Sequence, residues 1–252
     1  MTQKASKFNI VGLNINNISI TDLLIRINEL IKSQRPGYIC FANSHMAVES
    51  IKDNDFAKKL NQATLILPDG MPIAKSFSLI HGIRQERIPG MDFLPKLLNL
   101  CNDNKYRVFI LGSTEDTISK AINRVSSTFS QVTVCGFFSP DFNCPWDNEK
   151  IVSNINNSKP DVVIVALGCP KQEKWMFNHS SKINSVLFGL GGALPVFAGT
   201  SKNAPKWMKN NGLEWLFRLI LEPKRLWKRY LVTNTLISWY ILKQYINSKI
   251  KY

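Results

Sequence analysis

Asp69 is the residue of this sequence best suited to remove a proton from a substrate. It follows the apolar run 64–67, which reads as a buried strand, and it precedes Gly70. A carboxylate at such a place can accept a proton from a hydroxyl nucleophile when partial burial holds its pKa near the working pH. The position equally suits the N-cap of a helix that begins near Met71, and local sequence alone favours that cap.

Two glycine-containing segments follow other apolar runs and could bind phosphate. Gly112 and Ser113 come after the run 107–111, and Gly191 lies in Gly189-Leu190-Gly191-Gly192. Backbone N–H groups at the start of a helix attract a phosphate or a nucleotide. Neither segment completes a G-x-G-x-x-G fingerprint, and the sequence has no G-x-x-x-x-G-K-[ST]. Tight turns between strand and helix explain both segments equally well.

A denser polar segment, Gly168-Cys169-Pro170-Lys171-Gln172-Glu173, follows the apolar run 162–167. Pro170 favours the first turn of a helix. Gln172 and Glu173 would then lie near the end of the strand, where they could contact a substrate. Alternatively, Glu173 is only a favourable charge at the helix N-terminus.

Cationic side chains that could hold a phosphate lie in a loop and in the C-terminal segment. Arg87 falls in the loop 84–90 and could pair with a phosphate, with Glu86 or with water. The C-terminal segment carries the cations Arg218, Arg225, Lys228 and Arg229. On one continuous helix, positions 218, 225 and 229 would share a face. Arginines beside a cleft can neutralise a departing diphosphate without a metal; alternatively, they form a basic face that touches lipid headgroups.

Metal chemistry has no support in the spacing of the usual ligands. His45, His81 and His179 are far apart, no D-x-D follows a predicted strand, and the five cysteines include no C-x-x-C. We therefore expect no metal and no cofactor. An odd, unpatterned set of cysteines favours a reducing compartment, and residues 1–9 contain no apolar stretch of the kind found in signal peptides.

The elements that must position these residues alternate along the chain. Apolar, β-branched runs predict strands, and segments with apolar residues three and four apart predict helices between them. The strands are expected at 38–42, 64–67, 107–111, 132–135, 162–167 and 186–189, and the clearest helices at 20–32, 89–101, 115–126 and 171–181. Unbroken apolar strands are typical of a sheet covered by helices on both faces. The sequence therefore predicts an α/β, Rossmann-like, mostly parallel open sheet with its ligand at the carboxyl ends of the strands.

The last fifth of the chain differs in composition. Of the formal charge of +14, +9 lies in residues 200–252, together with four of the six tryptophans. Cations and indole rings suit the headgroup zone of an anionic membrane, although a nucleic-acid-binding surface has a similar composition. The most apolar stretch, 231–246, is interrupted by polar residues and is expected to lie on a bilayer without crossing it. We therefore expect a catalytic domain at 1–199 and a basic helical appendage at 200–252, with a helix break at Pro223.

Taken in order, these segments form a series of motifs. The series comprises Phe41-Ala42-Asn43, Leu67-Pro68-Asp69-Gly70, Glu86-Arg87-Ile88-Pro89-Gly90-Met91-Asp92, Leu111-Gly112-Ser113, Gly168-Cys169-Pro170-Lys171-Gln172-Glu173, Gly189-Leu190-Gly191-Gly192-Ala193, Ala204-Pro205-Lys206-Trp207-Met208, Glu214-Trp215-Leu216-Phe217-Arg218-Leu219 and Glu222-Pro223-Lys224-Arg225-Leu226-Trp227-Lys228-Arg229-Tyr230. Over about residues 10 to 232 the sequence resembles the WecG/TagA/CpsF family of bacterial glycosyltransferases.

The resemblance implies an inverting, metal-independent transferase. Such enzymes move N-acetylmannosamine or a related sugar from a UDP-sugar onto an undecaprenyl-diphosphate-linked sugar, at the cytoplasmic face of the plasma membrane. By resemblance Asp69 is the base, and Asn43, Arg87 and Gln172 line the pocket. The family's C-terminal appendage places arginines over the site; these match Arg218 and Arg225, and the third falls on Lys228.

Four positions depart from the family pattern, and three of these changes could bear on the choice of donor sugar. Phe41 stands where a threonine is common, and Pro195 stands where the family often has an aspartate. Asn203 replaces an arginine, and Lys228 keeps the charge of an arginine without the guanidinium fork. The same chemistry with UDP-glucose, UDP-glucuronate or UDP-N-acetylmannosaminuronate is therefore the alternative. Outside this class the rivals are a nucleic-acid-binding module and a noncatalytic scaffold; we expect no nucleic-acid partner. The oligomeric state is left open, homo-oligomers included.

Overall fold

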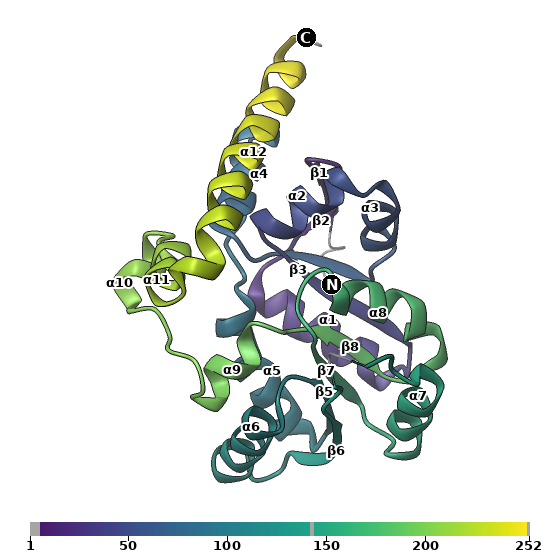
Figure 1. Ribbon diagram of the computed structural model, residues 1–252. Helices are drawn as coiled ribbons and strands as arrows, with labels where there is room; N and C mark the ends of the chain where they lie inside the picture. The colour runs from purple at the N-terminus through teal and green to yellow at the C-terminus, as the bar shows by residue number, and fades with distance from the viewer. Residues whose placement is uncertain (1–5, 142–143, 251–252) are drawn as a thin grey trace.

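A six-stranded parallel sheet forms the centre of the molecule (Figure 1). The computed structural model describes residues 6–141 and 144–250. The sheet has the strand order β4-β3-β8-β7-β5-β6, formed by β3 (Gly37–Ala42), β4 (Leu65–Pro68), β5 (Arg107–Gly112), β6 (Thr133–Phe138), β7 (Val162–Ala166) and β8 (Val186–Gly189). All six strands predicted from apolar runs are confirmed, with bounds that differ by at most a few residues.

The central strands are buried because both faces of the sheet are covered. Every residue of β7 is buried, and its neighbours β5 and β8 pair with it in parallel register. On one face lie α1 (Ile20–Lys32), α5 (Gly90–Asn104), α6 (Glu115–Thr128) and α9 (Ala193–Ala198). On the other lie α2 (Ser44–Lys52), α3 (Asn54–Asn61), α4 (Met71–His81), α7 (Asn148–Asn157), α8 (Lys171–His179) and the short 3₁₀ turn η1 (Ser180–Lys182). The predicted doubly wound α/β fold is confirmed.

A β-hairpin precedes the sheet, and the sequence analysis did not predict it. Strands β1 (Ser6–Ile10) and β2 (Leu13–Asn17) pair antiparallel through the turn Val11–Gly12, in which both residues have positive φ. The hairpin signals Asn-Gly and Asp-Gly are absent from this turn. Asn16, a residue uncommon in strands, is buried here because its side-chain oxygen accepts a hydrogen bond from the backbone N–H of Ile66 at 2.9 Å.

After α9 come the helices α10 (Lys206–Asn210), α11 (Glu214–Leu221) and α12 (Pro223–Ile250). The expected break at Pro223 is confirmed, because α11 ends just before it and α12 begins with it. Arg218 lies on α11 and Arg225 on α12. The two arginines therefore do not share a face of one continuous helix, as they would if the helix were unbroken.

The long helix α12 packs on the core along part of its length, and its C-terminal end projects beyond the body (Figure 1). Ile237 and Ile241 of α12 belong to the apolar cluster that holds α2 and α4 on the sheet. Within residues 6–141 and 144–250, no helix combines the length and the apolar character needed to cross a membrane.

Candidate active site

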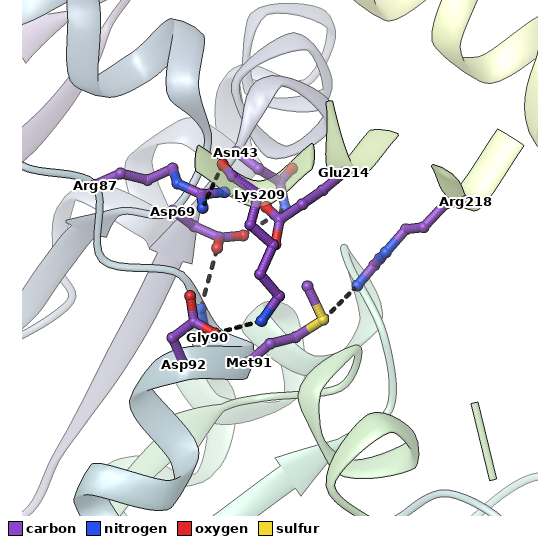
Figure 2. Close-up of polar contacts among 9 residues, drawn as sticks. All are labelled: Asn43, Asp69, Arg87, Gly90, Met91, Asp92, Lys209, Glu214 and Arg218. Carbon is purple, nitrogen blue, oxygen red and sulfur yellow. Dashed lines mark hydrogen bonds and ion pairs between the residues drawn. The ribbon is translucent and has the colours of Figure 1, made fainter. Parts of the chain in front are cut away.

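Asp69 lies at the end of β4 with its carboxylate held by two donors (Figure 2). The backbone N–H of Gly90 donates to one carboxylate oxygen at 3.1 Å, and the side-chain amide of Asn43 donates to the other at 3.4 Å. The N-cap of α4 is Gly70, and no side chain caps that helix. The alternative role of Asp69 as a helix cap is therefore wrong, and its carboxylate is available for chemistry.

The surroundings of Asp69 favour a base. Burial raises the pKa of its carboxyl above the ordinary value, and the Gly90 N–H, the charge of Arg218 and the Asn43 amide lower that pKa in part. A raised pKa strengthens the carboxylate as a proton acceptor near neutral pH.

Asn43 is oriented by the helix that follows β3. Its side-chain oxygen caps α2 by accepting from the backbone N–H groups of His45 at 3.0 Å and Met46 at 3.1 Å. With the oxygen fixed in this way, the amide nitrogen is directed to Asp69. The position therefore uses both ends of the amide, one to cap the helix and one to hold the carboxylate.

Phe41, one of the departures from the family pattern, lies in the core. Its side chain is 4% exposed, and its ring packs against Phe93 with centroids 5.1 Å apart. Both rings lie on the face of the sheet that α5 covers, under Gly90. Phe41 thus packs beneath the backbone that donates to Asp69 and does not lie at the protein surface.

Arg87 pairs with the appendage. Its guanidinium forms an ion pair with Glu214 of α11 and donates to the carbonyl of Lys209 at 3.3 Å. The two side chains are 13% and 14% exposed. Of the protein partners, Arg87 pairs with Glu214 and not with Glu86, whose carboxylate instead accepts from the backbone N–H of Ile20.

A second ion pair joins the appendage to the sheet domain. The Lys209 ammonium lies 2.7 Å from the carboxylate of Asp92, at the start of α5 (Figure 2). Together, Lys209–Asp92 and Arg87–Glu214 fasten α10 and α11 beside Asp69. We name these two ion pairs the latch.

Gln172 connects two turns at the strand ends. Its side-chain oxygen accepts from the backbone N–H groups of Gly168 at 3.2 Å and Gly191 at 3.1 Å. A Cβ on Gly191 would lie 2.5 Å from that oxygen, so only glycine fits there. Gln172 is 6% exposed, and its hydrogen bonds in this structure are to protein rather than directed at the cleft.

Glu173 is the most deeply buried acid at this edge of the sheet. It is 1% exposed, and one carboxylate oxygen accepts from the Gln172 amide at 2.7 Å. The other oxygen has no hydrogen-bond partner among the described residues. Burial raises the pKa of Glu173 to about 7, so its carboxyl is partly protonated at neutral pH.

Gly112 and Ser113 form a tight turn after β5. Both have positive φ, and a Cβ on Gly112 would lie 2.6 Å from the carbonyl oxygen of Ala166 on β7. The carbonyl of Ser113 accepts from the hydroxyl of Ser139 at 2.8 Å. Close approach of strands explains the glycine here, and a phosphate at this turn stays a prediction.

The three cations predicted over the site differ in position. Arg218 reaches it: one guanidinium nitrogen donates to the sulfur of Met91 at 3.3 Å, and the same group covers Gly192 (Figure 2). Arg225 is exposed and pairs with Glu222. Lys228 is exposed, with its ammonium 6.0 Å from the centroid of the Trp227 ring.

Arg229 was one of the C-terminal cations that the sequence suggested for phosphate, but the family match placed Lys228, and not Arg229, over the site. Arg229 is half-buried, and its charge acts on His45 and on Cys169. Burial, together with the charge of Arg229, lowers the pKa of His45 to about 4. The spacing of Arg225 and Arg229, four residues apart, was the sequence signal for this position.

The described residues contain no group of three His, Cys, Asp or Glu side chains that could hold a metal ion. The polar groups that do converge are a carboxylate, its two donors and cations from the appendage. A carboxylate beside fixed cations can accept a proton while charge develops on a leaving group nearby.

Comparison with known proteins identifies the family of this chain. The sequence pattern of the Glycosyl transferase WecG/TagA/CpsF family matches residues 8–251. A relative from Bacillus subtilis (strain 168), described as N-acetylglucosaminyldiphosphoundecaprenol N-acetyl-beta-D-mannosaminyltransferase, is 35% identical over 88% of this chain and 85% of its own length. A protein of the same description from Staphylococcus aureus (strain NCTC 8325 / PS 47) is 27% identical over 88% of this chain and 87% of its own. The chain belongs to the WecG/TagA/CpsF family and is a glycosyltransferase.

Proposed function

We propose that this enzyme transfers N-acetylmannosamine from UDP-N-acetylmannosamine to an undecaprenyl-diphosphate-linked N-acetylglucosamine, with inversion and without a metal. The acceptor and the sugar follow the description of the relatives from Bacillus subtilis and Staphylococcus aureus. The observation that carries the mechanism is the carboxylate of Asp69, which has a raised pKa and two fixed donors at the strand-end edge of the sheet.

Asp69 acts as general base in this proposal. It takes the proton of the acceptor hydroxyl, whose oxygen forms a bond to the anomeric carbon of the donor sugar. The bond from that carbon to the UDP oxygen breaks on the opposite face, and its electron pair leaves with UDP. One displacement of this kind inverts the anomeric configuration. The Gly90 N–H and the Asn43 amide keep the carboxylate in place during the transfer.

The appendage supplies positive charge for the departing diphosphate. Arg218 lies against the turn at Gly192, and its charge acts on Asp69. Arg225 follows at the start of α12. Fixed guanidinium groups are suited to charge that develops on phosphate oxygens, which is why no metal is needed in the proposal.

The same appendage is proposed to hold the enzyme on the inner face of the plasma membrane. Exposed apolar side chains recur three, four or eight residues apart along the outer side of α12: Trp227, Leu231, Trp239, Leu242, Ile246 and Ile250. Lys224, Lys228, Lys243 and Lys249 accompany them. An apolar stripe flanked by lysines suits an anionic interface. Binding to vesicles that contain anionic lipid should therefore exceed binding to neutral vesicles, and should fall when Trp239 and Leu242 are both replaced by Ser.

A donor panel tests the proposed reaction. The purified full chain is incubated in EDTA with a synthetic polyprenyl-diphosphate-linked N-acetylglucosamine and with each of four UDP-sugars: UDP-N-acetylmannosamine, UDP-glucose, UDP-glucuronate and UDP-N-acetylmannosaminuronate. We expect a β-linked N-acetylmannosamine product from the first alone. Product from another donor would reassign the sugar, and no turnover without added Mg²⁺ would contradict the metal-free mechanism.

A further inference from the structure

Arg229 is a half-buried cation without a partner. Its side-chain Nε is buried and makes no hydrogen bond, and no ion pair to its guanidinium occurs among residues 6–141 and 144–250. A guanidinium carries five N–H donors that must be satisfied when water is removed. Burying a charge without a partner is unfavourable, so the folded chain keeps Arg229 in a position that an anion would stabilise.

The groups around Arg229 are positive or neutral. Its charge acts on His45 at the start of α2 and on Cys169 in the turn after β7, so the guanidinium lies near these two residues at the strand-end edge of the sheet. The charges of Arg225 and Arg218 also act on it, and both repel it. Of these two, Arg225 has a carboxylate partner, Glu222. Among residues 6–141 and 144–250, no carboxylate forms an ion pair with Arg229 or with Arg218, although the charge of Arg218 acts on Asp69.

The start of α2 adds to the positive potential at this place. A helix N-terminus carries partial positive charge and exposed N–H groups. His45 stays neutral there, because burial and the Arg229 charge lower its pKa to about 4. The positive side-chain charge at this place is therefore that of the arginines.

The neighbouring residue provides a contrast. Lys228 is exposed and lies over the ring of Trp227, on the side of α12 that faces away from the sheet. Two adjacent cations on the same helix turn thus face opposite environments. The sequence match assigned the third cation of the site to Lys228, whereas the geometry favours Arg229.

We propose that Arg229, together with Arg218, binds a diphosphate group between the start of α2 and the turn after β7, and that Lys228 takes no part in this site. The inference rests on the proposed function, in which both substrates carry a diphosphate, one in UDP and one in the polyprenyl-diphosphate acceptor. The planar guanidinium fork can hold two phosphate oxygens at once, which an ammonium at position 229 could not do.

Calorimetric titration of three proteins tests the proposal: the full-length wild type, Arg229→Gln and the matched control Lys228→Gln. Each is titrated with UDP and, separately, with farnesyl diphosphate, in EDTA. Arg229→Gln should weaken binding of at least one probe by about 10- to 100-fold, the range for hydrogen bonds to a charged group. Lys228→Gln should change both affinities less than about twofold, as expected for an exposed charge.

The two probes distinguish the sources of the diphosphate. A loss confined to UDP assigns the site to the donor, a loss confined to farnesyl diphosphate assigns it to the acceptor, and either supports the proposal. Equal affinities in Arg229→Gln and the wild type, or equal losses in the two variants, would overturn it. If the wild type bound neither probe, the proposed function itself would fail.

Folding of the variant serves as the control. Because the Nε of Arg229 has no hydrogen-bond partner and its guanidinium no ion pair within the described part of the chain, Arg229→Gln should have a Tm equal to or above that of the wild type. A weaker affinity accompanied by an unchanged or higher Tm marks a binding residue, whereas a lowered Tm would indicate a structural role and contradict the inference.

Discussion

The two sides of the active site are built differently. On the sheet side, Asp69 is held by the Gly90 backbone and by Asn43, both fixed by the elements that follow the strands. On the appendage side, the two ion pairs of the latch join α10 and α11 to the sheet domain. Hydrogen bonds from rigid elements place a reacting group accurately. Ion pairs can separate and re-form, so we expect the appendage side to be the one that opens for substrates.

The largest effect is expected from Asp69→Asn. The variant keeps the shape of the side chain but cannot take a proton, so turnover should fall by about 10²–10⁴-fold, the usual loss of a general base. UDP affinity and the unfolding midpoint should change little, because charge repulsion is not introduced. Turnover at the wild-type rate would remove Asp69 from the mechanism.

A smaller but still large effect is expected from breaking the more buried ion pair of the latch. Arg87→Met leaves Glu214 buried without its partner, and losses of about 3–5 kcal/mol are typical of such changes. Hydrogen exchange should show earlier opening of α10 and α11 than of the sheet, with lower turnover.

The double variant Arg87→Met with Glu214→Met provides the matched control. It removes both charges, so α10 and α11 should exchange more slowly than in Arg87→Met alone. Equal exchange in the single and the double variant would show that the ion pair does not hold the appendage.

The raised pKa of Glu173 should make the free energy of unfolding depend on pH. Its folded-state pKa of about 7 lies above the ordinary value of 4.5, so its contribution to stability is fully present below pH 4.5 and is lost as pH rises through 7. Replacing it by Gln removes the cost of a buried charge, worth up to about 3 kcal/mol for such a shift. Urea unfolding of Glu173→Gln should match the wild type at pH 4.5 and exceed it at pH 8; an equal deficit at both values would refute this assignment.

The smallest effect is expected at the outer ion pair of the latch. Asp92 is far more exposed than Glu214, and pairs in contact with water contribute about 0.2–1 kcal/mol. Lys209→Met should therefore lower stability by less than about 1 kcal/mol, and 0.5 M NaCl should erase the difference in a urea titration. A loss as large as that of Arg87→Met would make the two ion pairs equivalent.

The sheet could be predicted because its central strands are unbroken apolar runs, as in β7, and because helices with clear periodicity lie between them. Because the carboxyl ends of neighbouring parallel strands lie at one edge of the sheet, the proximity of Asn43, which follows β3, and Asp69, which follows β4, could also be predicted. The hairpin β1–β2 escaped prediction because its turn lacks the usual residues and its strands contain several asparagines, one of them buried.

Contacts made across long sequence distances account for most of the rest. Glu214, the partner of Arg87, is 127 residues away, and no local pattern connects them. Gln172 was expected in the pocket, and its burial under two glycine turns depends on how β7 and β8 end. The orientations of Lys228 and Arg229 depend on how α12 rests on α2 and α4, which follows from Ile237 and Ile241 much later in the helix.

The pH profile of kcat/KM for Asn43→Asp, compared with the wild type, tests the role of Asp69 most directly. Aspartate caps a helix as well as asparagine does, but it removes a donor from Asp69 and adds a negative charge beside it. Both changes raise the pKa of Asp69. If Asp69 is the base, the wild type loses activity as the pH falls through the pKa of this carboxyl, and the variant loses it at distinctly higher pH. An acid limb at the same pH in both proteins would contradict the assignment of Asp69 as the base.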